Sequence, residues 1–234
     1  MLEALKKAVC QANLDLVREG LVVQTFGNAS GLDRVQGMMV IKPSGVSYAV
    51  LKPAQMVVVA LATGKVVQGK LRPSSDAETH LELYRAFTGI GGIVHTHSLH
   101  ATAWAQTARP IPALGTTHAD HFHGEVPCTR PMTPAAIKMD YEANTGRVIV
   151  ERFRNLDPLR HPAVLVAQHG PFTWGRDVAE AVHNAVALEF IARLAAETLQ
   201  IRPGTPAMPD ELRDKHFFRK HGPSAYYGQS KQTK

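Results

Sequence analysis

The sequence predicts an α/β fold in which helices and strands are interspersed along the chain and pack in layers. Two observations support this prediction. Short apolar runs that are rich in β-branched residues and bounded by Gly or Pro, such as residues 91–94 and 163–167, are typical of buried strands. Longer stretches, such as residues 2–19 and 179–199, carry apolar side chains at the spacing of an amphipathic helix.

Local patterns define the elements in chain order. In the first half, they predict a helix at 2–19 closed by Gly20, strands at 21–26 and 38–41, a hairpin of strands at 57–61 and 65–67, and a helix ending near residue 87. That helix is expected to open at Ser74-Ser75-Asp76, because Ser75 and Glu78 have capping-box spacing. After residue 90, the local patterns predict helices at 101–107 and 179–199, and strands at 91–94, 147–150 and 163–167.

Length and composition are those of a water-soluble enzyme. The chain has 234 residues, 44% of them hydrophobic, and no segment resembles a linker, so we expect one domain spanning residues 1–234. No apolar run approaches the roughly 18 residues of a membrane span, and the charged N-terminus has no secretory signal. Cys10 and Cys128 are too few for a disulfide framework, so the expected location is the cytoplasm, with no membrane partner.

The net charge of +6 bears on the class of ligand. The basic residues are scattered, and much of their excess lies near the C-terminus, which argues against a nucleic-acid partner. An excess of basic over acidic residues also suits a small phosphorylated substrate.

Histidines follow two of the predicted buried strands. His95-Thr96-His97 ends the run at 91–94, and Gln168-His169-Gly170 follows the run at 163–167. Residues two apart share one face of a strand, so His95 and His97 point the same way. His169 completes a three-imidazole site if its strand end lies nearby. Three neutral imidazoles suit a divalent transition metal, most often zinc, and leave a coordination position open for catalysis.

Another histidine pair competes for this assignment. His121-Phe122-His123 has the same spacing, and the residues alone do not exclude it as a metal site. It lacks a third ligand at a strand end, which makes the first set the better candidate.

Three loops combine small residues with hydrogen-bond donors. They are Gly27-Asn28, Ser44-Gly45 and Ser74-Ser75. Turn backbones and helix N-termini present free N–H groups, which suit a phosphate. Each loop alone could simply turn the chain or cap a helix, but together with Lys42 they indicate an anion site.

At these positions the chain resembles the class II aldolase/adducin family. The matching motifs are Gly27-Asn28-Ala29-Ser30, Lys42-Pro43-Ser44-Gly45, Ser74-Ser75-Asp76, His95-Thr96-His97 and His169-Gly170. The resemblance covers nearly the whole chain and implies a three-layer α/β/α sandwich with a central, largely antiparallel (mixed) sheet. It also implies a cyclic homotetramer with active sites between adjacent subunits, in which the segment at roughly 210–234 reaches a neighbouring subunit.

Within the family, Gly115-Thr116-Thr117-His118-Ala119-Asp120 and Ala225-Tyr226-Tyr227-Gly228 are similar to a branch of sugar-phosphate epimerases. This implies a phosphorylated pentulose substrate, the interconversion of L-ribulose 5-phosphate and D-xylulose 5-phosphate, and one Zn²⁺ per subunit. The chemistry agrees, because the C4 hydrogen is too far from the C2 ketone to be acidic. Cleavage and re-formation of the C3–C4 bond can invert C4, and a Lewis-acidic metal can stabilise the negative charge that develops.

The resemblance also implies roles for individual residues. Asp120 and Tyr227 match the two acid/base groups, with Tyr227 coming from the neighbouring subunit, and His216 matches a supporting position. Asp76 is expected in the metal set beside the three histidines, where family aldolases carry Glu as the acid/base; direct ligation by Asp76 stays open. The phosphate is expected at Gly27, Asn28, Lys42, Ser44, Gly45, Ser74 and Ser75.

Two other functions remain open from the sequence. A class II sugar-phosphate aldolase of the L-fuculose 1-phosphate type would have a similar metal site and release its aldehyde. The shorter carboxylate at Asp76, together with Asp120, favours the epimerase. A non-catalytic adducin-like interaction module would have no need of three metal-binding histidines.

Overall fold

The computed structural model describes residues 2–223 and 225–228. Its centre is a seven-stranded sheet with the order β4-β3-β2-β1-β5-β7-β6. All neighbouring strands in this order run antiparallel, which confirms the predicted antiparallel α/β architecture. The strands are β1 (Asn28–Asp33), β2 (Met38–Ile41), β3 (Val57–Ala60), β4 (Val66–Gln68), β5 (Gly92–His95), β6 (Ala163–Val166) and β7 (Gly170–Gly175).

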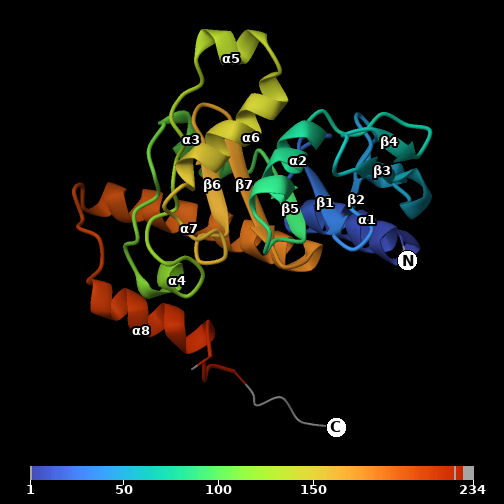
Figure 1. Cartoon of the computed structure of the whole chain (residues 1–234). Helices are drawn as coiled ribbons and strands as arrows, with labels where there is room; N and C mark the ends of the chain where they lie inside the picture. Colours follow the sequence, from blue (N-terminus) through green and yellow to red (C-terminus); the bar gives the residue numbers. More distant parts are fainter. Residues whose placement is uncertain (1, 224, 229–234) are drawn as a thin grey trace.

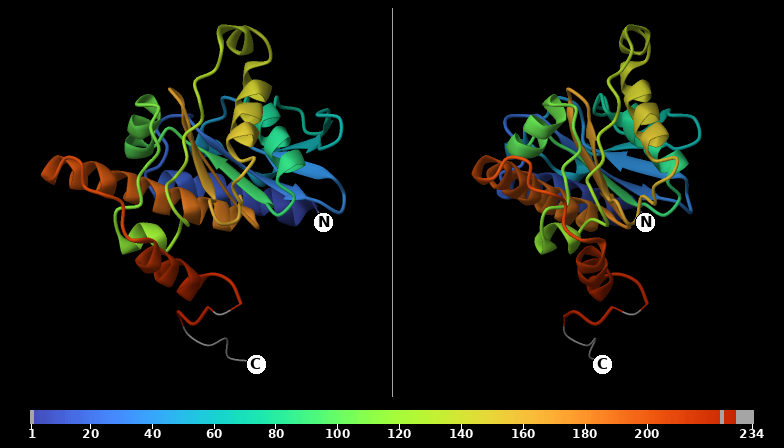
Figure 2. Two further views of the ribbon diagram at one scale, coloured as in Figure 1. Left: turned by 60° about the vertical axis from the view of Figure 1, so that its left-hand side comes forward. Right: turned by 90° about the vertical axis from the view of Figure 1, so that its left-hand side faces the viewer.

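Helices cover both faces of the sheet, as the two views of Figure 2 show. One face is covered by α1 (Leu2–Arg18), α3 (Leu99–Gln106) and α7 (Val178–Ile201), and the other by α2 (Ala77–Ala86) and α6 (Tyr141–Arg152). The remaining elements are 3₁₀ turns at Tyr48–Val50 and Pro53–Gln55, and helices α4 (Thr116–Ala119), α5 (Pro134–Lys138) and α8 (Asp210–Lys220). No helix in the described part of the chain is long and apolar enough to cross a membrane.

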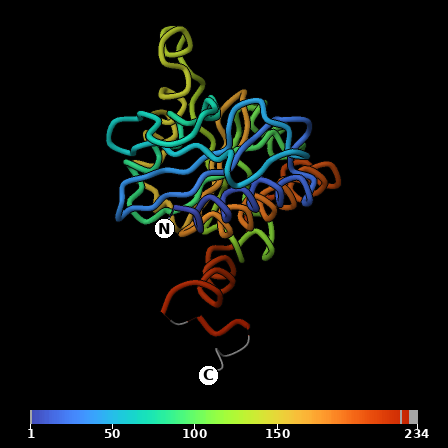
Figure 3. Tube along the Cα trace, turned by 90° about the vertical axis from the view of Figure 1, so that its right-hand side faces the viewer, coloured from blue at the N-terminus to red at the C-terminus, as the bar shows by residue number. Residues whose placement is uncertain are grey.

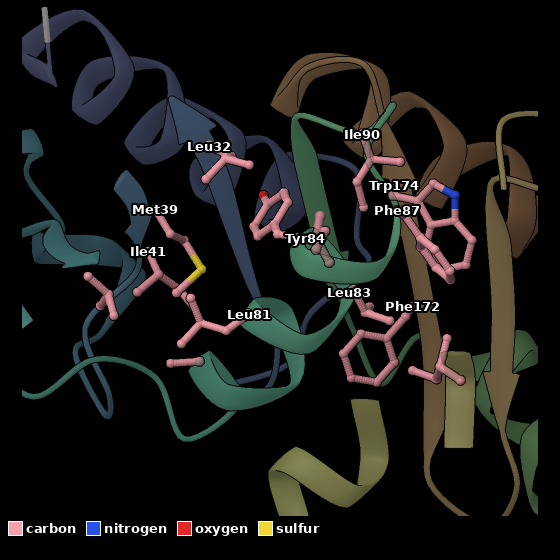
Figure 4. Close-up of a cluster of buried hydrophobic side chains, with 14 of the residues drawn as sticks. Leu32, Met39, Ile41, Leu81, Leu83, Tyr84, Phe87, Ile90, Phe172 and Trp174 are labelled. Atoms are coloured by element: carbon pink, nitrogen blue, oxygen red, sulfur yellow. The ribbon is translucent and has the colours of Figure 1, made fainter. Parts of the chain in front are cut away.

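Alternating side chains of the strands build three hydrophobic clusters, one on the face covered by α2 and α6 and two on the opposite face. In β5, Ile93 packs toward α2 and α6, whereas Val94 packs toward α1 and α7. In the core beneath α2, Tyr84, Phe87 and Trp174 are buried aromatic side chains (Figure 4). Both faces of β2, β3, β5 and β6 are therefore covered, which explains why these strands read as continuous apolar runs.

The prediction of a strand at 21–26 is wrong, because the strand begins at Asn28 and contains the residues that were expected to form a loop. Close packing of α1 explains the difference. A Cβ atom on Gly31 would lie 2.8 Å from the Leu5 Cδ1 atom, so the helix approaches only because Gly31 has no side chain. Asn13 of α1 both donates to the Ala29 carbonyl (3.1 Å) and accepts from the Ala29 N–H (2.9 Å).

The prediction of a strand at 147–150 is also wrong, because these residues belong to α6. The buried face of this helix packs on α2, and a Cβ atom on Gly146 would lie 2.6 Å from the Glu82 Cβ atom. The run Val148-Ile149-Val150 is β-branched, but such a short run does not distinguish a buried helix from a strand. Strand β7 was not predicted at all.

The ends of the first two helices test the predicted caps. Gly20 adopts a left-handed conformation (φ 70°), and the Leu21 N–H donates to the Leu16 carbonyl (2.9 Å), which confirms the predicted C-terminal cap of α1. The predicted capping box of α2 is wrong. Asp76 is the N-cap residue, and it makes no side-chain capping hydrogen bond.

Two segments project from opposite ends of the molecule (Figures 1 and 3). Helix α5, with the start of α6, extends from one end of the three-layer body. Helix α8 packs against α4 at the other end, and residues 221–223 and 225–228 lie farther from the sheet.

Candidate metal and phosphate site

Strand pairing brings the three predicted metal-binding histidines together. His95 ends β5, His97 follows two residues later, and His169 lies in the turn between β6 and β7. Because β5 pairs with β7, one ligand-capable atom from each histidine lies within 4.8 Å of the others. In the described part of the chain, this is the only group of three or more His, Cys, Asp or Glu side chains that could hold a metal ion.

The ring of His95 is oriented by two contacts. Its Nδ1–H donates to the Pro171 carbonyl (2.9 Å), and its ring stacks on Phe172 with centroids 4.2 Å apart. Because the carbonyl only accepts, the hydrogen of a neutral His95 ring is on Nδ1, and the lone pair that a metal ligand requires is on Nε2. That Nε2 atom lies 3.1 Å from the His97 Nε2 atom, close to the roughly 3.3 Å between neighbouring nitrogens in a tetrahedral zinc site.

The surroundings keep the other two imidazoles neutral. Burial and the neighbouring His95 and His97 lower the pKa of His169 to about 4. Burial, followed by His95, also lowers the pKa of His97. Neutral imidazoles whose donor atoms lie close together suit a divalent transition metal, so these side chains fit the predicted ion.

All the predicted phosphate-binding residues lie around the same cavity, which has a volume of about 410 Å³. Asp76 also lines it, next to the three histidines, although it is outside the group of closely spaced donors. The lining residues are Thr25, Phe26, Gly27, Asn28, Lys42, Pro43, Ser44, Gly45, Ser74, Ser75, Asp76, His95, His97, Tyr141, Glu142 and His169.

Backbone hydrogen bonds tie the phosphate loops to one another. The Ser44 N–H donates to the Arg72 carbonyl (3.0 Å), and the Ser74 N–H donates to the Lys42 carbonyl (2.9 Å). The third loop is tied to the metal strand, because a Cβ atom on Gly27 would lie 2.7 Å from the His95 carbonyl oxygen. Gly27 also has a φ of 97°, so only glycine fits easily there.

Lys42 places an ammonium group, without a carboxylate partner among the described residues, in the wall of this cavity, where its Nζ atom donates to the Pro43 carbonyl (3.4 Å). Its side chain is buried (2% exposed), and its Nζ atom lies 4.6 Å from the centroid of the Tyr48 ring. Burial lowers the pKa of the Lys42 ammonium group, and no carboxylate in the described part of the chain forms an ion pair with it. A buried charge of this kind calls for an anion from outside the chain.

Asp76 and Asn28 form a polar pair between the phosphate loops and the histidines. The Asn28 side-chain amide donates to the Asp76 carboxylate (2.7 Å), while the Asn28 carbonyl oxygen is buried without a partner. Burial raises the pKa of Asp76, but the neighbouring His95 and the hydrogen bond from Asn28 bring it below its usual value. Asp76 therefore stays a carboxylate at neutral pH, in contact with the cavity.

Several residues that line this cavity were not predicted from the sequence. Tyr141 and Glu142 begin α6, and the Tyr141 hydroxyl lies 3.5 Å from the His169 Nδ1 atom. They come near the histidines only because α6 packs on α2, and part of α6 was expected to be a strand. Thr25 and Phe26 were missed because they lay in another wrongly predicted strand.

The two predicted acid/base residues lie elsewhere, in a cluster that we call the Asp120 cluster. Asp120 follows α4 and does not line the histidine cavity. Its carboxylate accepts hydrogen bonds from Arg219 (2.7 Å) and His216 (3.1 Å) and pairs with Lys220 (3.2 Å). Burial alone would raise the pKa of Asp120, but hydrogen bonds from Arg219 and its neighbours lower it to about 2.

Tyr227 belongs to the same cluster. Its ring centroid lies 4.9 Å from the guanidinium carbon of Arg219 and 4.6 Å from the Nζ atom of Lys220, and its side chain is 61% exposed. One chain thus presents Asp120 and Tyr227 together, on elements at the opposite end of the molecule from α5 and the start of α6 (Figure 1). His216, predicted to have a supporting role, contacts Asp120.

The competing histidine pair is divided between different partners. The His121 ring lies 5.4 Å from the His183 ring, whereas the His123 Nε2 atom lies 2.9 Å from the Asp214 carboxylate. Neither residue joins a ligand group of three among the residues described.

The class II aldolase type of domain is defined by two features seen here. One is an antiparallel sheet between helical layers, and the other is a set of three histidines beside the predicted phosphate-binding loops. The chain belongs to the family described as Class II Aldolase and Adducin N-terminal domain, whose model matches residues 7–196. The chain is 54% identical over 228 residues to "L-ribulose-5-phosphate 4-epimerase UlaF" from Salmonella paratyphi A, which covers 97% of this chain and 100% of the relative. The same figures hold for the protein of that name from Salmonella typhi.

Solved structures with this fold include an L-fuculose 1-phosphate aldolase. Its TM-score is 0.76 at 26% sequence identity, with 91% of this chain and 94% of that chain covered. The fold is thus shared with an aldolase, and the fold alone does not distinguish epimerisation from aldol cleavage.

Proposed function

We propose that this chain is an L-ribulose-5-phosphate 4-epimerase, which interconverts L-ribulose 5-phosphate and D-xylulose 5-phosphate. The observation that carries the proposal is one cavity that contains both the three histidines and the predicted phosphate-binding loops. Its wall also holds Lys42, which is buried and has no carboxylate partner among the described residues. The 54% identity to proteins named for this activity selects the epimerase within the family.

The reaction requires cleavage of a carbon–carbon bond. Loss of the proton on the C4 hydroxyl lets the C4 oxygen become a carbonyl while the electrons of the C3–C4 bond move toward the C2 ketone. The products are an enediolate and glycolaldehyde phosphate. If the aldehyde turns its other face before the bond re-forms, C4 is inverted and nothing is released.

The cavity residues have separate tasks in this scheme. His95, His97 and His169 would hold one divalent metal, proposed as zinc, which supplies Lewis-acid stabilisation of negative charge on the C2 and C3 oxygens. The phosphate would bind Lys42 and the three loops, so that glycolaldehyde phosphate stays in place during the turn of its aldehyde. Asp76 would remain an ionised neighbour of the metal.

Proton transfer at C4 requires a group on each face of the aldehyde. Asp120, which is held as a carboxylate, would take the proton from one epimer, and Tyr227 would return a proton to the oxygen on the other face. The two groups exchange roles in the reverse reaction. His216 would support Asp120 through their hydrogen bond.

The position of the Asp120 cluster bears on the assembly. The cavity and the cluster lie on different parts of one chain, so we propose that the cluster of one subunit completes the cavity of its neighbour. Such a contact is heterologous, because it joins two different surfaces of the subunit. When the subunits close into a ring, every subunit makes this contact with both of its neighbours. A cyclic homotetramer of single-domain subunits, with the segment from residue 210 onward at each boundary, is the assembly that we propose.

A coupled assay tests the proposal. The purified protein should form D-xylulose 5-phosphate from L-ribulose 5-phosphate, and a chelator should abolish the activity until a divalent metal is restored. The L-fuculose 1-phosphate aldolase fold makes net aldol cleavage the second candidate. Release of free aldehyde from L-fuculose 1-phosphate, without epimerisation of L-ribulose 5-phosphate, would favour that alternative. Activity of neither kind, in a protein that binds no metal, would favour an interaction module.

A further inference from the structure

Arg219 and Lys220 both contact the two proposed acid/base residues, and Arg219 makes the larger number of hydrogen bonds. Its Nη2 atom donates to both Asp120 carboxylate oxygens (2.9 and 2.7 Å), and its Nε atom donates to one of them (3.1 Å). The same guanidinium carbon lies 4.9 Å from the centroid of the Tyr227 ring.

The backbone of Arg219 also binds Tyr226 and Tyr227, which follow α8. Its carbonyl oxygen accepts hydrogen bonds from the backbone N–H groups of both Tyr226 and Tyr227, each at 2.9 Å. Arg219 lies in the last turn of α8, so the direction of the chain after the helix depends on this residue.

We propose that Arg219 is a positioning residue that holds Asp120 and Tyr227 at a fixed separation, so that they act as one acid/base unit. This inference rests on the proposed epimerase function. Two groups that serve opposite faces of one aldehyde must keep their spacing while the aldehyde turns between them. Misplacement of such groups by about 1 Å can cost on the order of 100-fold in rate.

The chemistry of arginine suits this task better than that of its neighbours. A guanidinium group is a planar fork that can engage a carboxylate at two points while an aromatic ring lies near its face. Lys220 contacts both Asp120 and Tyr227, but only as a point charge. His216 forms a hydrogen bond with Asp120, and its interaction does not include Tyr227. The hydrogen-bond geometry from Arg219 therefore defines the orientation of the Asp120 carboxylate.

The first test compares Arg219→Met with Arg213→Met. Arg213 lies in the same helix and pairs with Asp210 and Asp214, outside the Asp120 cluster, so it is a matched control. Arg219→Met should lower kcat for epimerisation by about 10- to 100-fold, with metal content and KM little changed, whereas Arg213→Met should leave kcat unchanged. Arg219→Lys should recover part of the loss, because it restores the charge without the fork.

A double-mutant cycle separates positioning from general stabilisation. If Arg219 acts through Asp120, then Arg219→Met should have little further effect on kcat in an Asp120→Asn background. Added guanidinium ion should restore several-fold activity to Arg219→Ala and none to Asp120→Asn. Equal losses in both backgrounds, or normal kcat in Arg219→Met, would overturn the inference.

A measurement without substrate distinguishes this inference from the proposed function. Chymotrypsin should cut after Tyr226 or Tyr227 faster in Arg219→Met than in the parent protein or in Arg213→Met. If the parent protein does not convert L-ribulose 5-phosphate, the proposed function is wrong whatever the variants do. If the parent is active and Arg219→Met resists chymotrypsin as the parent does, the positioning role is wrong.

Discussion

At the scale of single residues, the cavity combines groups that would be unfavourable without ligands. Three imidazoles converge with their donor atoms within 4.8 Å of one another, and Lys42 is buried without a carboxylate partner. Packing alone does not explain the position of Lys42, because lysine is seldom buried without a charged partner. The sequence named the three histidines and Lys42 as site residues, since each lies in a short contiguous motif next to a strand or turn, but it did not predict that Lys42 is buried.

The metal assignment predicts the behaviour of His97→Asn. Loss of one of three imidazoles should sharply reduce the bound metal and abolish epimerisation, because two protein ligands remain. Metal content measured on the purified variant, together with the coupled assay, checks this. His121→Asn is the control and should keep the metal, so full occupancy in His97→Asn or loss of metal in His121→Asn would contradict the assignment.

The phosphate assignment predicts that Lys42→Met raises KM. A hydrogen bond to a charged group contributes about 1.5–3 kcal/mol, which corresponds to an increase of roughly 10- to 100-fold. The free energy of unfolding should not fall, because the change removes a buried and unpaired charge. The exposed Lys7→Met is the control for KM. An unchanged KM, or a large loss of stability, would show that Lys42 has a structural task instead.

At the scale of elements, the sequence predicted strands β2, β5 and β6, the β3–β4 hairpin, and helices α1, α3 and α7 to within a few residues. Local periodicity fails at β1 and β7. Strand β1 contains Asn-Ala-Ser-Gly, which is typical of a turn, and it is a strand because α1 and two neighbouring strands pack against it. Strand β7 begins Gly-Pro, which usually ends a strand. Tertiary contacts decide both cases.

The approach of α7 to β5 leads to a prediction for Gly92→Ala. An added Cβ atom would lie 2.4 Å from backbone atoms of Asp177 and Val178, so the start of α7 must shift. We expect a loss of about 1–3 kcal/mol in the free energy of unfolding, measured in urea. Gly115→Ala is the control, because nothing lies within 4 Å of its added Cβ atom. Equal stability of the two variants would contradict the close packing.

Attachment of α8 to α4 predicts a dependence on pH. Hydrogen bonds lower the pKa of folded Asp120 to about 2, below the roughly 3.9 of an unfolded chain. The stabilisation is therefore complete above the unfolded pKa and is lost as the pH falls from about 4 to about 2. Urea unfolding at several pH values should show the parent protein more stable than Asp120→Asn at pH 6, with the difference shrinking below pH 4. A constant difference would contradict the ion cluster.

At the scale of the whole molecule, the sequence predicted the three-layer architecture through its resemblance to a family. The same resemblance named Asp120 and Tyr227, but it did not place them together on one chain. That placement depends on α8, which packs on α4 through contacts between residues almost a hundred positions apart, such as Asp120 and Arg219. Sequence spacing carries no information about such a contact.

Mixed oligomers test the proposed exchange between subunits. Combining inactive His97→Asn subunits with inactive Asp120→Asn subunits should restore part of the activity, because some boundaries then join an intact cavity to an intact cluster. Combining Asp120→Asn with Tyr227→Phe subunits should restore none, because every cluster carries one defect. The coupled assay on verified mixtures measures both. Recovery only in the second mixture would show that the two acid/base groups come from different subunits.

The central place of β5 has a consequence for how the site arises during folding. His95 lies on a strand whose two partners, β1 and β7, come from distant parts of the chain. Closing such long loops is slow, because chain entropy is lost before the pairing contributes stability. We expect the third imidazole to join the first two only when the sheet is complete. Metal uptake measured during refolding would then report completion of the sheet, and the ion would have no part in its nucleation.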